Sequence, residues 1–341
     1  MELRKDPITR SWVLIGDDEP RPPIGPSCPY CPGNEASCGA PIFSLTQDGR
    51  YGGIHVFPHP HPMYQIEGAT ERRADGIYDK MRSVGAHEVV VEHPDHERRL
   101  VVRSDAEISA LLECWASRLT DLKKDLRFKY ITVFKNVGEL AGQQIRHPHS
   151  EITATAFIPR RILYELHASQ EYFQIKERCV LCDIRRQEEQ QGLRVVEISR
   201  NYLAVCPFAS RVPYELWILP RYHHHSFEAD LLRQRDNLEL AGILRSSVAR
   251  LERITDAYHL VLHTCPNTAS RSELEGYWTT LQEDYHWHIE ILPITEKRTR
   301  SYSIKETYYC PLSPEMAAAQ LRQLPALLEA PPQSRFEFQP R

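Results

Sequence analysis

One order of features occurs twice in this chain of 341 residues, and this repetition limits the folds open to it. Each half has a Cys-x-x-Cys pair, strand-like segments, a long helical segment, another strand, and a strand with alternate histidines. The pattern indicates internal duplication. We therefore expect two related halves, residues 1–177 and 178–328, and a poorly ordered tail at 329–341 that is rich in Pro, Gln and Arg.

Hydrophobic periodicity predicts the main elements of each half. Apolar residues at helical spacing predict helices over 105–126, with Ser104 or Asp105 as the cap, over 161–176, and from about 230 to 256. Alternating or continuous apolar runs predict strands at 87–92, 131–134 and 152–158 in the first half, and at 195–198, 203–205, 214–219 and 285–293 in the second.

Composition narrows the class of protein. Hydrophobic residues make up 41% of the chain, which is enough to fill a sizeable core, and the net charge of -4 gives no basic field for nucleic acid. No apolar run approaches membrane-spanning length and the first residues do not form a signal segment, so we expect a cytoplasmic protein. An odd number of cysteines, nine, favours metal ligands and free thiols over a disulfide framework.

The central run Arg146-His147-Pro148-His149-Ser150-Glu151 concentrates chemistry in the first half. In an extended segment side chains alternate between faces, so His147 and His149 point the same way. They could be two metal ligands, or one ligand and one nucleophile. The Pro/Gly-rich loop with Cys28 and Cys31 supplies two thiolates that suit tetrahedral Zn²⁺, which is half of a coordination sphere.

Eight motifs in series carry a family resemblance. They are Cys-Pro-x-Cys-Pro-Gly-Asn-Glu, Val-Val-x-Glu-x-Pro-x-His, Asn-x-Gly before Ala-Gly, His-Pro-His-Ser, the second Cys-x-x-Cys, Trp-Ile-Leu-Pro-Arg, His-x-x-Pro and His-Trp-His-Ile-Glu. In this order, over residues 6–325, they resemble the galactose-1-phosphate uridylyltransferase family of the histidine-triad superfamily. The resemblance implies an α+β fold of two histidine-triad-like halves, with mainly antiparallel half-barrel sheets flanked by helices.

The resemblance also implies a reaction. Family members transfer a nucleoside monophosphate through a covalent nucleotidyl-histidine, and the attacking residue here would be His149, because imidazole is both nucleophile and leaving group near neutral pH. The implied partners are a nucleotide sugar and a sugar phosphate, in galactose metabolism, and the implied assembly is a homodimer. Glu151 stands where the family has glutamine, which donates to the phosphoryl group. An ionised carboxylate would repel phosphate, so it must be protonated, turned away, or bound to a cation or a cationic substrate.

Metal ligands follow from the same resemblance. A first structural zinc would be held by Cys28, Cys31, His96 and His147. A second would be held either by Cys179, Cys182, His223 and His286, or by Glu165, His263, His286 and His288, and the two sets compete for His286. We favour the first set because thiolates bind zinc more tightly than carboxylates and imidazoles do.

Further departures from the family pattern lie around the donor pocket. Gln144 replaces a serine of the phosphate loop, His59 replaces an asparagine of the base-binding loop, and the flexible loop before the central run offers Asn136 and Gly142. Arg21 stands alone where the family has two arginines, and Lys305 could reach a phosphate from a segment without the usual Gly-Thr-Gly. These differences argue that the donor or the acceptor is not the usual one.

Three functions are open at this point. The first is transfer of a uridylyl group from UDP-hexose to hexose 1-phosphate. The second delivers the nucleotidyl group to inorganic phosphate, as relatives that phosphorolyse ADP-glucose or adenylylsulfate do. The third is a zinc-stabilised binding protein without turnover, for which Glu151 is the best support.

Overall fold

The computed structural model describes residues 1–16, 28–34, 37–47, 51–234, 237–270, 279–295 and 307–326. Within these ranges it confirms the expected α+β class, because helices pack against large antiparallel sheets. Arg21, Lys305 and the tail 329–341 lie outside the described residues, so what the sequence predicts for them stays a prediction.

A ten-stranded sheet runs through the whole molecule in the order β10-β11-β12-β14-β13-β8-β9-β7-β4-β3. The first half contributes β3 (Phe43–Gln47), β4 (Tyr51–Pro58), β7 (Gly85–Val91), β8 (Tyr130–Val137) and β9 (His149–Thr155). The second contributes β10 (Val195–Ile198), β11 (Tyr202–Val205), β12 (Leu216–Pro220), β13 (Tyr258–His263) and β14 (His288–Pro293).

The two halves of this sheet have the same topology. The halves meet where β8 pairs antiparallel with β13. Outward from this junction the first half runs β8, β9, β7, β4, β3 and the second runs β13, β14, β12, β11, β10. In both halves this is the fourth strand in chain order, followed by the fifth, third, second and first. Each half inserts its main helices between its third and fourth strands. This arrangement supports the duplication that we infer from the sequence, and it places β9 and β14, the strands that begin at His149 and His288, in equivalent positions.

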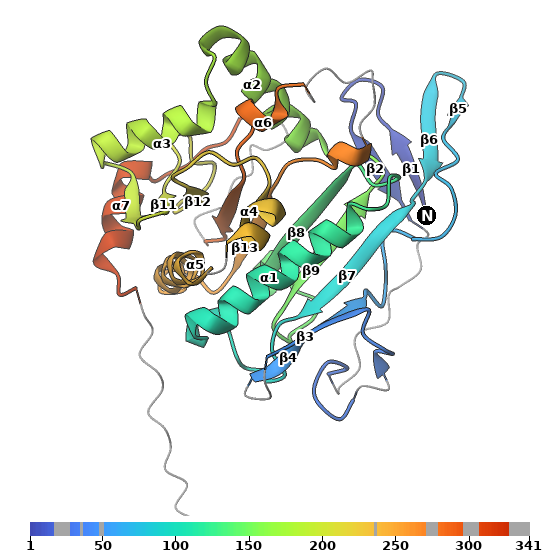
Figure 1. The fold of residues 1–341 in the computed structure, drawn as a ribbon, viewed down its shortest axis with the longest axis horizontal. Coiled ribbons are helices and arrows are strands. Elements are labelled where there is room, and N and C mark those ends of the chain that lie inside the picture. The colour runs from blue at the N-terminus through green and yellow to red at the C-terminus, as the bar shows by residue number, and fades with distance from the viewer. Residues whose placement is uncertain are drawn as a thin grey trace, which may run out of the picture.

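The helices between the third and fourth strands cover one face of the sheet (Figure 1). They are α1 (Asp105–Leu122), α4 (Phe227–Arg233) and α5 (Leu238–Leu251). At the start of α1, Ser104 Oγ accepts a hydrogen bond from the Glu107 amide and the Glu107 carboxylate accepts one from the Ser104 amide, which forms a capping box. Of the two caps that the sequence offers, Ser104 is the one observed. The single helix predicted over about 230–256 is wrong: α4 ends before Gln234, which has extended backbone (ψ 133°), and α5 begins at Leu238.

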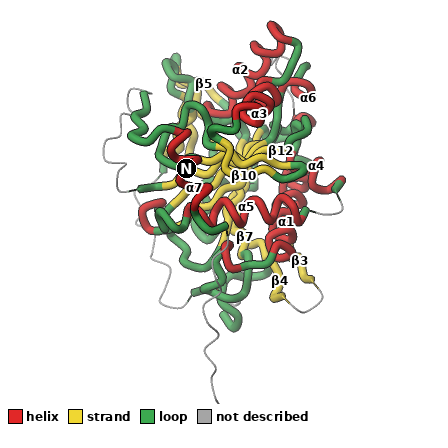
Figure 2. Tube along the Cα trace, turned by 90° about the vertical axis from the view of Figure 1, so that its left-hand side faces the viewer, coloured by secondary structure: helices red, strands yellow, loops and turns green. Residues whose placement is uncertain are grey.

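The remaining elements lie around this core. Figures 1 and 2 show α2 (Arg160–Lys176), α3 (Val180–Gln191) and α6 (Leu281–Asp284) gathered at one end of the molecule. A 4-stranded sheet of β1 (Glu2–Lys5), β2 (Trp12–Ile15), β5 (Arg73–Asp75) and β6 (Tyr78–Arg82) flanks the first half. Short 3-10 turns occur at Leu100–Val102, Glu139–Ala141 and Thr268–Ser270, and α7 (Pro314–Gln323) packs near β10.

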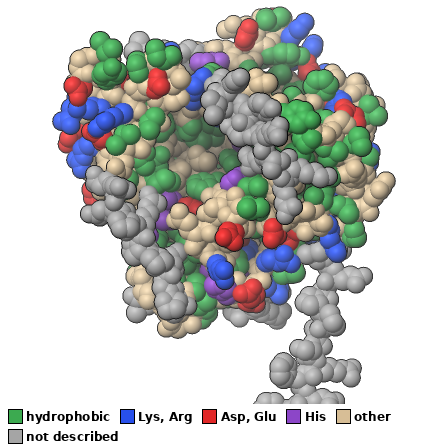
Figure 3. All heavy atoms as spheres, turned by 180° about the vertical axis from the view of Figure 1, so that it is seen from behind, with side chains coloured by type: hydrophobic (Ala, Val, Ile, Leu, Met, Phe, Trp, Pro, Cys, Tyr) green, Lys and Arg blue, Asp and Glu red, His purple; other side chains and the backbone are tan. Residues whose placement is uncertain are grey.

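Alternation along β9 divides its side chains between the two sheet faces. Ile152 and Ala154 join the core beneath α1, and Trp115 of α1 donates its indole N–H to Ser150 Oγ at 2.8 Å. The intervening side chains of His149 and Glu151 therefore point to the opposite face. Figure 3 shows that face from behind; it is hollowed near its middle, and histidine side chains are visible around the hollow.

Two general expectations can be compared with the described residues. All nine cysteines are free thiols, which agrees with the absence of a disulfide framework. Among the helices that the model describes, none combines the length and apolar character needed to cross a bilayer.

The loop after β8 gives a stability prediction. Gly138 has φ +84° and ψ 157°, a region that is essentially restricted to glycine, and a Cβ there would lie 2.6 Å from the Asp256 carbonyl oxygen. Gly142 has φ +74° but nothing within 4 Å of its Cβ position. Gly138→Ala should lower the free energy of unfolding by about 2–4 kcal/mol and Gly142→Ala by about 1 kcal/mol, because only the first adds a clash to backbone strain. Urea unfolding measures both; equal losses would contradict the clash.

Candidate active site and metal centres

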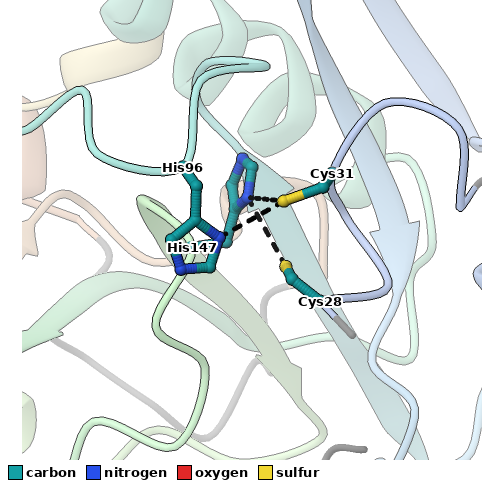
Figure 4. Close-up of side chains that lie close together, drawn as sticks. All are labelled: Cys28, Cys31, His96 and His147. Atoms are coloured by element: carbon teal, nitrogen blue, oxygen red, sulfur yellow. Dashed lines mark hydrogen bonds between the residues drawn. The ribbon is translucent and has the colours of Figure 1, made fainter. Parts of the chain in front are cut away.

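Four predicted metal ligands of the first half converge although they come from three distant segments (Figure 4). Cys28 and Cys31 project from their loop, His96 from the segment after β7, and His147 from just before β9. Cys31 Sγ lies 3.3 Å from His96 Nδ1 and 3.7 Å from His147 Nδ1, and Cys28 Sγ lies 3.6 Å from His147 Nδ1. Bond lengths of about 2.3 Å to sulfur and 2.0 Å to nitrogen in a tetrahedral zinc site put S and N about 3.5 Å apart, so the donors fit that ion.

The orientation of His147 supports the same interpretation. Its Nε2 lies 2.6 Å from the His93 carbonyl oxygen, to which only an Nε2–H can donate, so the lone pair is on Nδ1, the atom that faces the two sulfurs. Burial lowers the pKa of His147, which keeps the ring neutral near pH 7. A neutral imidazole whose outer N–H is held by a carbonyl is the usual state of a zinc-bound histidine.

The second half repeats this group with Cys179, Cys182, His223 and His286. Cys182 Sγ lies 3.4 Å from His223 Nδ1 and 3.5 Å from His286 Nδ1, and His223 Nε2–H donates to the Gln282 carbonyl at 2.8 Å. A hydrogen bond from Cys179 and the two imidazoles lower the pKa of the Cys182 thiol, which favours the thiolate that binds metals. His286 therefore directs its Nδ1 to the cysteines, as we favour from the sequence.

Three of the four residues of the alternative second metal site lie close together, and His286 is not among them. Glu165, His263 and His288 lie close to one another, with Glu165 Oε2 3.0 Å from His263 Nδ1 and the two imidazole rings stacked 4.5 Å apart. Burial alone would lower the pKa of His263, but the charge of Glu165 raises it to about 10. Without a metal, the group is therefore a buried ion pair at neutral pH.

A contact with the backbone of His147 orients the His149 side chain as a nucleophile. Its Nδ1 lies 2.8 Å from the His147 carbonyl oxygen, so Nδ1 carries the proton and Nε2 carries the lone pair. The side chain is 4% exposed and its Nε2 faces the carboxylate of Glu151, with Oε1 at 3.6 Å. This tautomer leaves Nε2 free to attack an electrophile from a fixed position.

Buried charges hold the backbone of the nucleophile. Lys135 Nζ on β8 donates to the His149 carbonyl at 2.7 Å and to Glu92, which also accepts from Arg103 at 2.9 Å and donates its amide to the Pro148 carbonyl at 3.1 Å. Burial would raise the pKa of Glu92, but Lys135 and Arg103 lower it to about 2. Sequence patterns do not reveal this cluster, because its members lie on three separate segments within otherwise ordinary stretches.

Glu151 is not turned away from the nucleophile. Its Oε2 accepts the Nε2–H of His87 at 2.8 Å, and its Oε1 faces His149. Burial would raise the pKa of Glu151, but His149, while its ring is protonated, and the hydrogen bond from His87 lower it to about 2, so the unliganded protein holds a carboxylate. Two like charges about 4 Å apart repel by roughly 4 kcal/mol at an effective dielectric constant of about 20, a real cost for a phosphoryl group that enters here.

Two further histidines complete this pocket. His59 and His87 stack with ring centroids 4.0 Å apart and planes 4° apart, and His59 Nε2 lies 4.0 Å from Glu151 Oε2. Burial, followed by the proximity of His87, lowers the pKa of His59 to about 4. Sequence reasoning selects His59 but misses His87. The signal for His87 is a histidine two positions before the three consecutive valines of β7, on the face that Glu151 shares.

The other predicted substrate residues lie on the loop side of β8. The Asn136 side chain pairs with His259 of β13 at 2.8 Å, across the junction of the two halves. Gly142 ends the 3-10 turn Glu139–Ala141 in left-handed conformation, and the exposed Gln144 lies two residues later. Their roles toward a substrate stay predictions.

Comparisons with known proteins agree with this geometry. Residues 15–159 match the model of the galactose-1-phosphate uridyl transferase N-terminal domain. A galactose-1-phosphate uridylyltransferase of Thermotoga maritima is 28% identical over 335 residues, which cover 95% of this chain and 98% of that protein. This chain is therefore similar to galactose-1-phosphate uridylyltransferases over nearly its whole length.

A relative with a different activity is about as similar to this chain. An ADP-glucose phosphorylase of Arabidopsis thaliana is 27% identical over 309 residues, covering 86% of this chain and 84% of that protein. A solved structure of an Arabidopsis ADP-glucose phosphorylase with bound ADP-glucose matches with a TM-score of 0.74 and 26% identity, covering 95% and 99% of the two chains. Its similarity to both kinds of enzyme supports the prediction that this chain is a nucleotidyltransferase.

The two cysteine–histidine groups give a prediction on metal content. The purified protein should contain two zinc ions per chain, one for each group, and Cys28→Ser or Cys182→Ser should each remove one because a ligand is lost. Cys38→Ser is the matched control: Cys38 neighbours the first group and donates its thiol to the Pro29 carbonyl, but it is not one of the four ligands. Elemental analysis by mass spectrometry measures the ratio, and a Cys38→Ser protein that lost as much zinc as Cys28→Ser would contradict the assignment.

Proposed function

We propose that this chain transfers a nucleoside monophosphate from a nucleotide hexose, UDP-hexose in the first instance, to hexose 1-phosphate through a covalent nucleotidyl intermediate on His149. The observation that carries the proposal is the His147 carbonyl contact that holds His149 as the Nδ1–H tautomer with a free Nε2. The names of the relatives, uridylyltransferases of several organisms among them, support the choice of substrates.

The first half-reaction breaks a P–O bond and forms a P–N bond. The second breaks that P–N bond and forms a new P–O bond. The Nε2 lone pair of His149 attacks the α-phosphorus, and the departing hexose 1-phosphate keeps the electron pair of the broken P–O bond. The second hexose 1-phosphate then attacks the same phosphorus and returns the pair to Nε2. Zinc in the first group would be structural: four protein ligands leave no open position, and the ion would hold His147 and thereby β9 in place.

A second candidate function uses inorganic phosphate as the acceptor. It is favoured by the similarity to the Arabidopsis ADP-glucose phosphorylase, since that relative is as similar to this chain as the Thermotoga uridylyltransferase is. We propose further that the enzyme acts as a homodimer in the cytoplasm. A zinc-stabilised binding protein without turnover is the remaining alternative, and the first experiment below separates it from both enzymes.

Labelling of the nucleophile tests the proposal. The zinc-loaded enzyme is mixed with UDP-glucose or ADP-glucose labelled with ³²P at the α-phosphorus, then denatured, and acid-labile label should be found on His149. His149→Ala should abolish labelling and lower turnover at least ~10³-fold, because no other group supplies the nucleophile. His288→Gln is the control, since His288 holds the equivalent place in the second half and its variant should still be labelled. If no donor labels the wild type, the binding protein is the better interpretation.

The acceptor is decided in the same preparation. After free donor is removed, labelled enzyme is divided between galactose 1-phosphate and inorganic phosphate. Recovery of label as a nucleotide sugar supports the first function, and recovery as a nucleoside diphosphate supports the second.

A further inference from the structure

The carboxylate of Glu151 lies where a phosphoryl group must arrive. Nε2 of His149 has Glu151 Oε1 as a neighbour at 3.6 Å, and an attacked phosphorus approaches the same nitrogen to about 3–3.5 Å before it reacts. The non-bridging oxygens of that phosphorus therefore come beside Oε1. Two negatively charged oxygens without a proton or cation between them repel, and the hydrogen bond of Oε2 to His87 prevents Glu151 from turning away.

The orientation of the neighbouring histidines prevents a metal ion from neutralising this repulsion. Glu151, His59 and His87 lie close enough to bind one, but both imidazoles face the carboxylate with Nε2. Nδ1 of His87 accepts the Met63 amide at 3.3 Å, and Nδ1 of His59 accepts the His61 amide at 3.0 Å. Each neutral ring therefore carries its proton on Nε2, which points at Glu151, whereas a ligand needs its lone pair there. The zinc-group histidine His147 shows the opposite orientation.

The same hydrogen bonds decide which oxygen of Glu151 can be protonated. His87 Nε2–H already donates to Oε2, so a proton on that oxygen would face another proton. A proton on Oε1 has no such conflict: it faces Nε2 of His149 and the position beside that nitrogen, which the phosphoryl oxygens take when the lone pair engages phosphorus. A carboxylic acid in this state accepts at Oε2 and donates at Oε1, which is the donor and acceptor arrangement of a glutamine amide.

We propose that Glu151 acts on the nucleotide donor as a neutral acid, whose Oε1–H donates a hydrogen bond to a non-bridging oxygen of the phosphoryl group that His149 attacks. The inference rests on the proposed function. Glu151 takes one proton from solvent as the donor binds. The Nε2 lone pair then forms the N–P bond, the leaving hexose 1-phosphate departs with the pair of the broken P–O bond, and the proton stays on Oε1. Transfer to the acceptor reverses these steps, after which the proton returns to solvent. His87 is a positioning residue, since it acts through Glu151.

The charges around Glu151 set the direction of the pH dependence. It faces His149 from β9, His87 from β7, His59 from the segment after β4, and Tyr30 from the cysteine loop. Burial and then the thiols of Cys38 and Cys28 raise the pKa of Tyr30, so it carries no charge here. In the unliganded protein His149, while its ring is protonated, and the hydrogen bond from His87 keep Glu151 ionised. A bound phosphoryl anion adds a like charge and favours the acid. Because the protonated form is the active one, the rate of nucleotidyl transfer falls as pH rises.

The test compares Glu151→Gln and Glu151→Met with the wild type. Zinc-loaded enzyme is mixed in single turnovers with α-³²P-labelled UDP-glucose and, separately, ADP-glucose, and the rate of label transfer to His149 is measured between about pH 6 and pH 9. The wild-type rate should fall on the alkaline side by about tenfold per pH unit, as one proton is required. Glu151→Gln supplies the donor without a proton, so its rate should stay level over that range and exceed the wild-type rate at least tenfold at the alkaline end. Glu151→Met, without a donor, should lie at least ~10²-fold below Glu151→Gln throughout.

Other outcomes have distinct meanings. A Glu151→Gln rate below the wild type at every pH would overturn the proposal, because it would mean that the ionised carboxylate is needed. A wild-type rate that stays level to the alkaline end would also overturn it, whether or not the variants fold. Absence of label in the wild type and in both variants with either donor would instead remove the proposed function itself.

Discussion

The contact between the His147 carbonyl oxygen and Nδ1–H of His149 is the interaction on which the active site depends. It fixes the tautomer of the nucleophile, and it does so from a residue whose own side chain belongs to the first cysteine–histidine group. The position of Nε2 is therefore coupled to a metal-binding group far away in sequence. Loss of a cysteine in the loop at 28–31 would reach the nucleophile through His147, just before β9, without any direct contact.

The two halves hold two copies of this arrangement, and the residues around each copy make them different. His288 in the second half also places Nδ1 near the carbonyl of the residue two before it, at 3.3 Å. Its ring stacks on His263, which the charge of Glu165 keeps protonated, so an imidazolium lies against it. The ring of His149 instead has a carboxylate before Nε2, and the pocket on its far side is built from neutral donors. The same fold thus provides a buried ion pair in one half and a nucleophile in the other.

Much of this could be predicted from the sequence because the informative residues are local. The cysteine pairs, the alternate histidines and the cap at Ser104 or Asp105 each lie within a few positions, so short-range sequence patterns are enough to predict them. The helix predicted over 230–256 failed because the apolar spacing continues through a break that only the extended backbone at Gln234 reveals. The choice between the two sets that compete for His286 needed the direction of one ring, and His87 and Lys135 needed the register of β7, β8 and β9, which are long-range properties of the sheet.

Glu151 shows how a residue that opposes the chemistry can be retained in a site. A carboxylate beside a phosphoryl nucleophile is unfavourable only while both of its oxygens are unprotonated. Because the Met63 amide fixes the tautomer of His87, and His87 occupies Oε2, the one position left for a proton is the oxygen that faces the substrate. Two backbone amides in the loop after β4 thereby exclude a metal and direct the proton at the same time. The backbone that holds His59 and His87 is thus as much a part of the site as their side chains, and a change in that loop would alter the charge that the phosphoryl group meets.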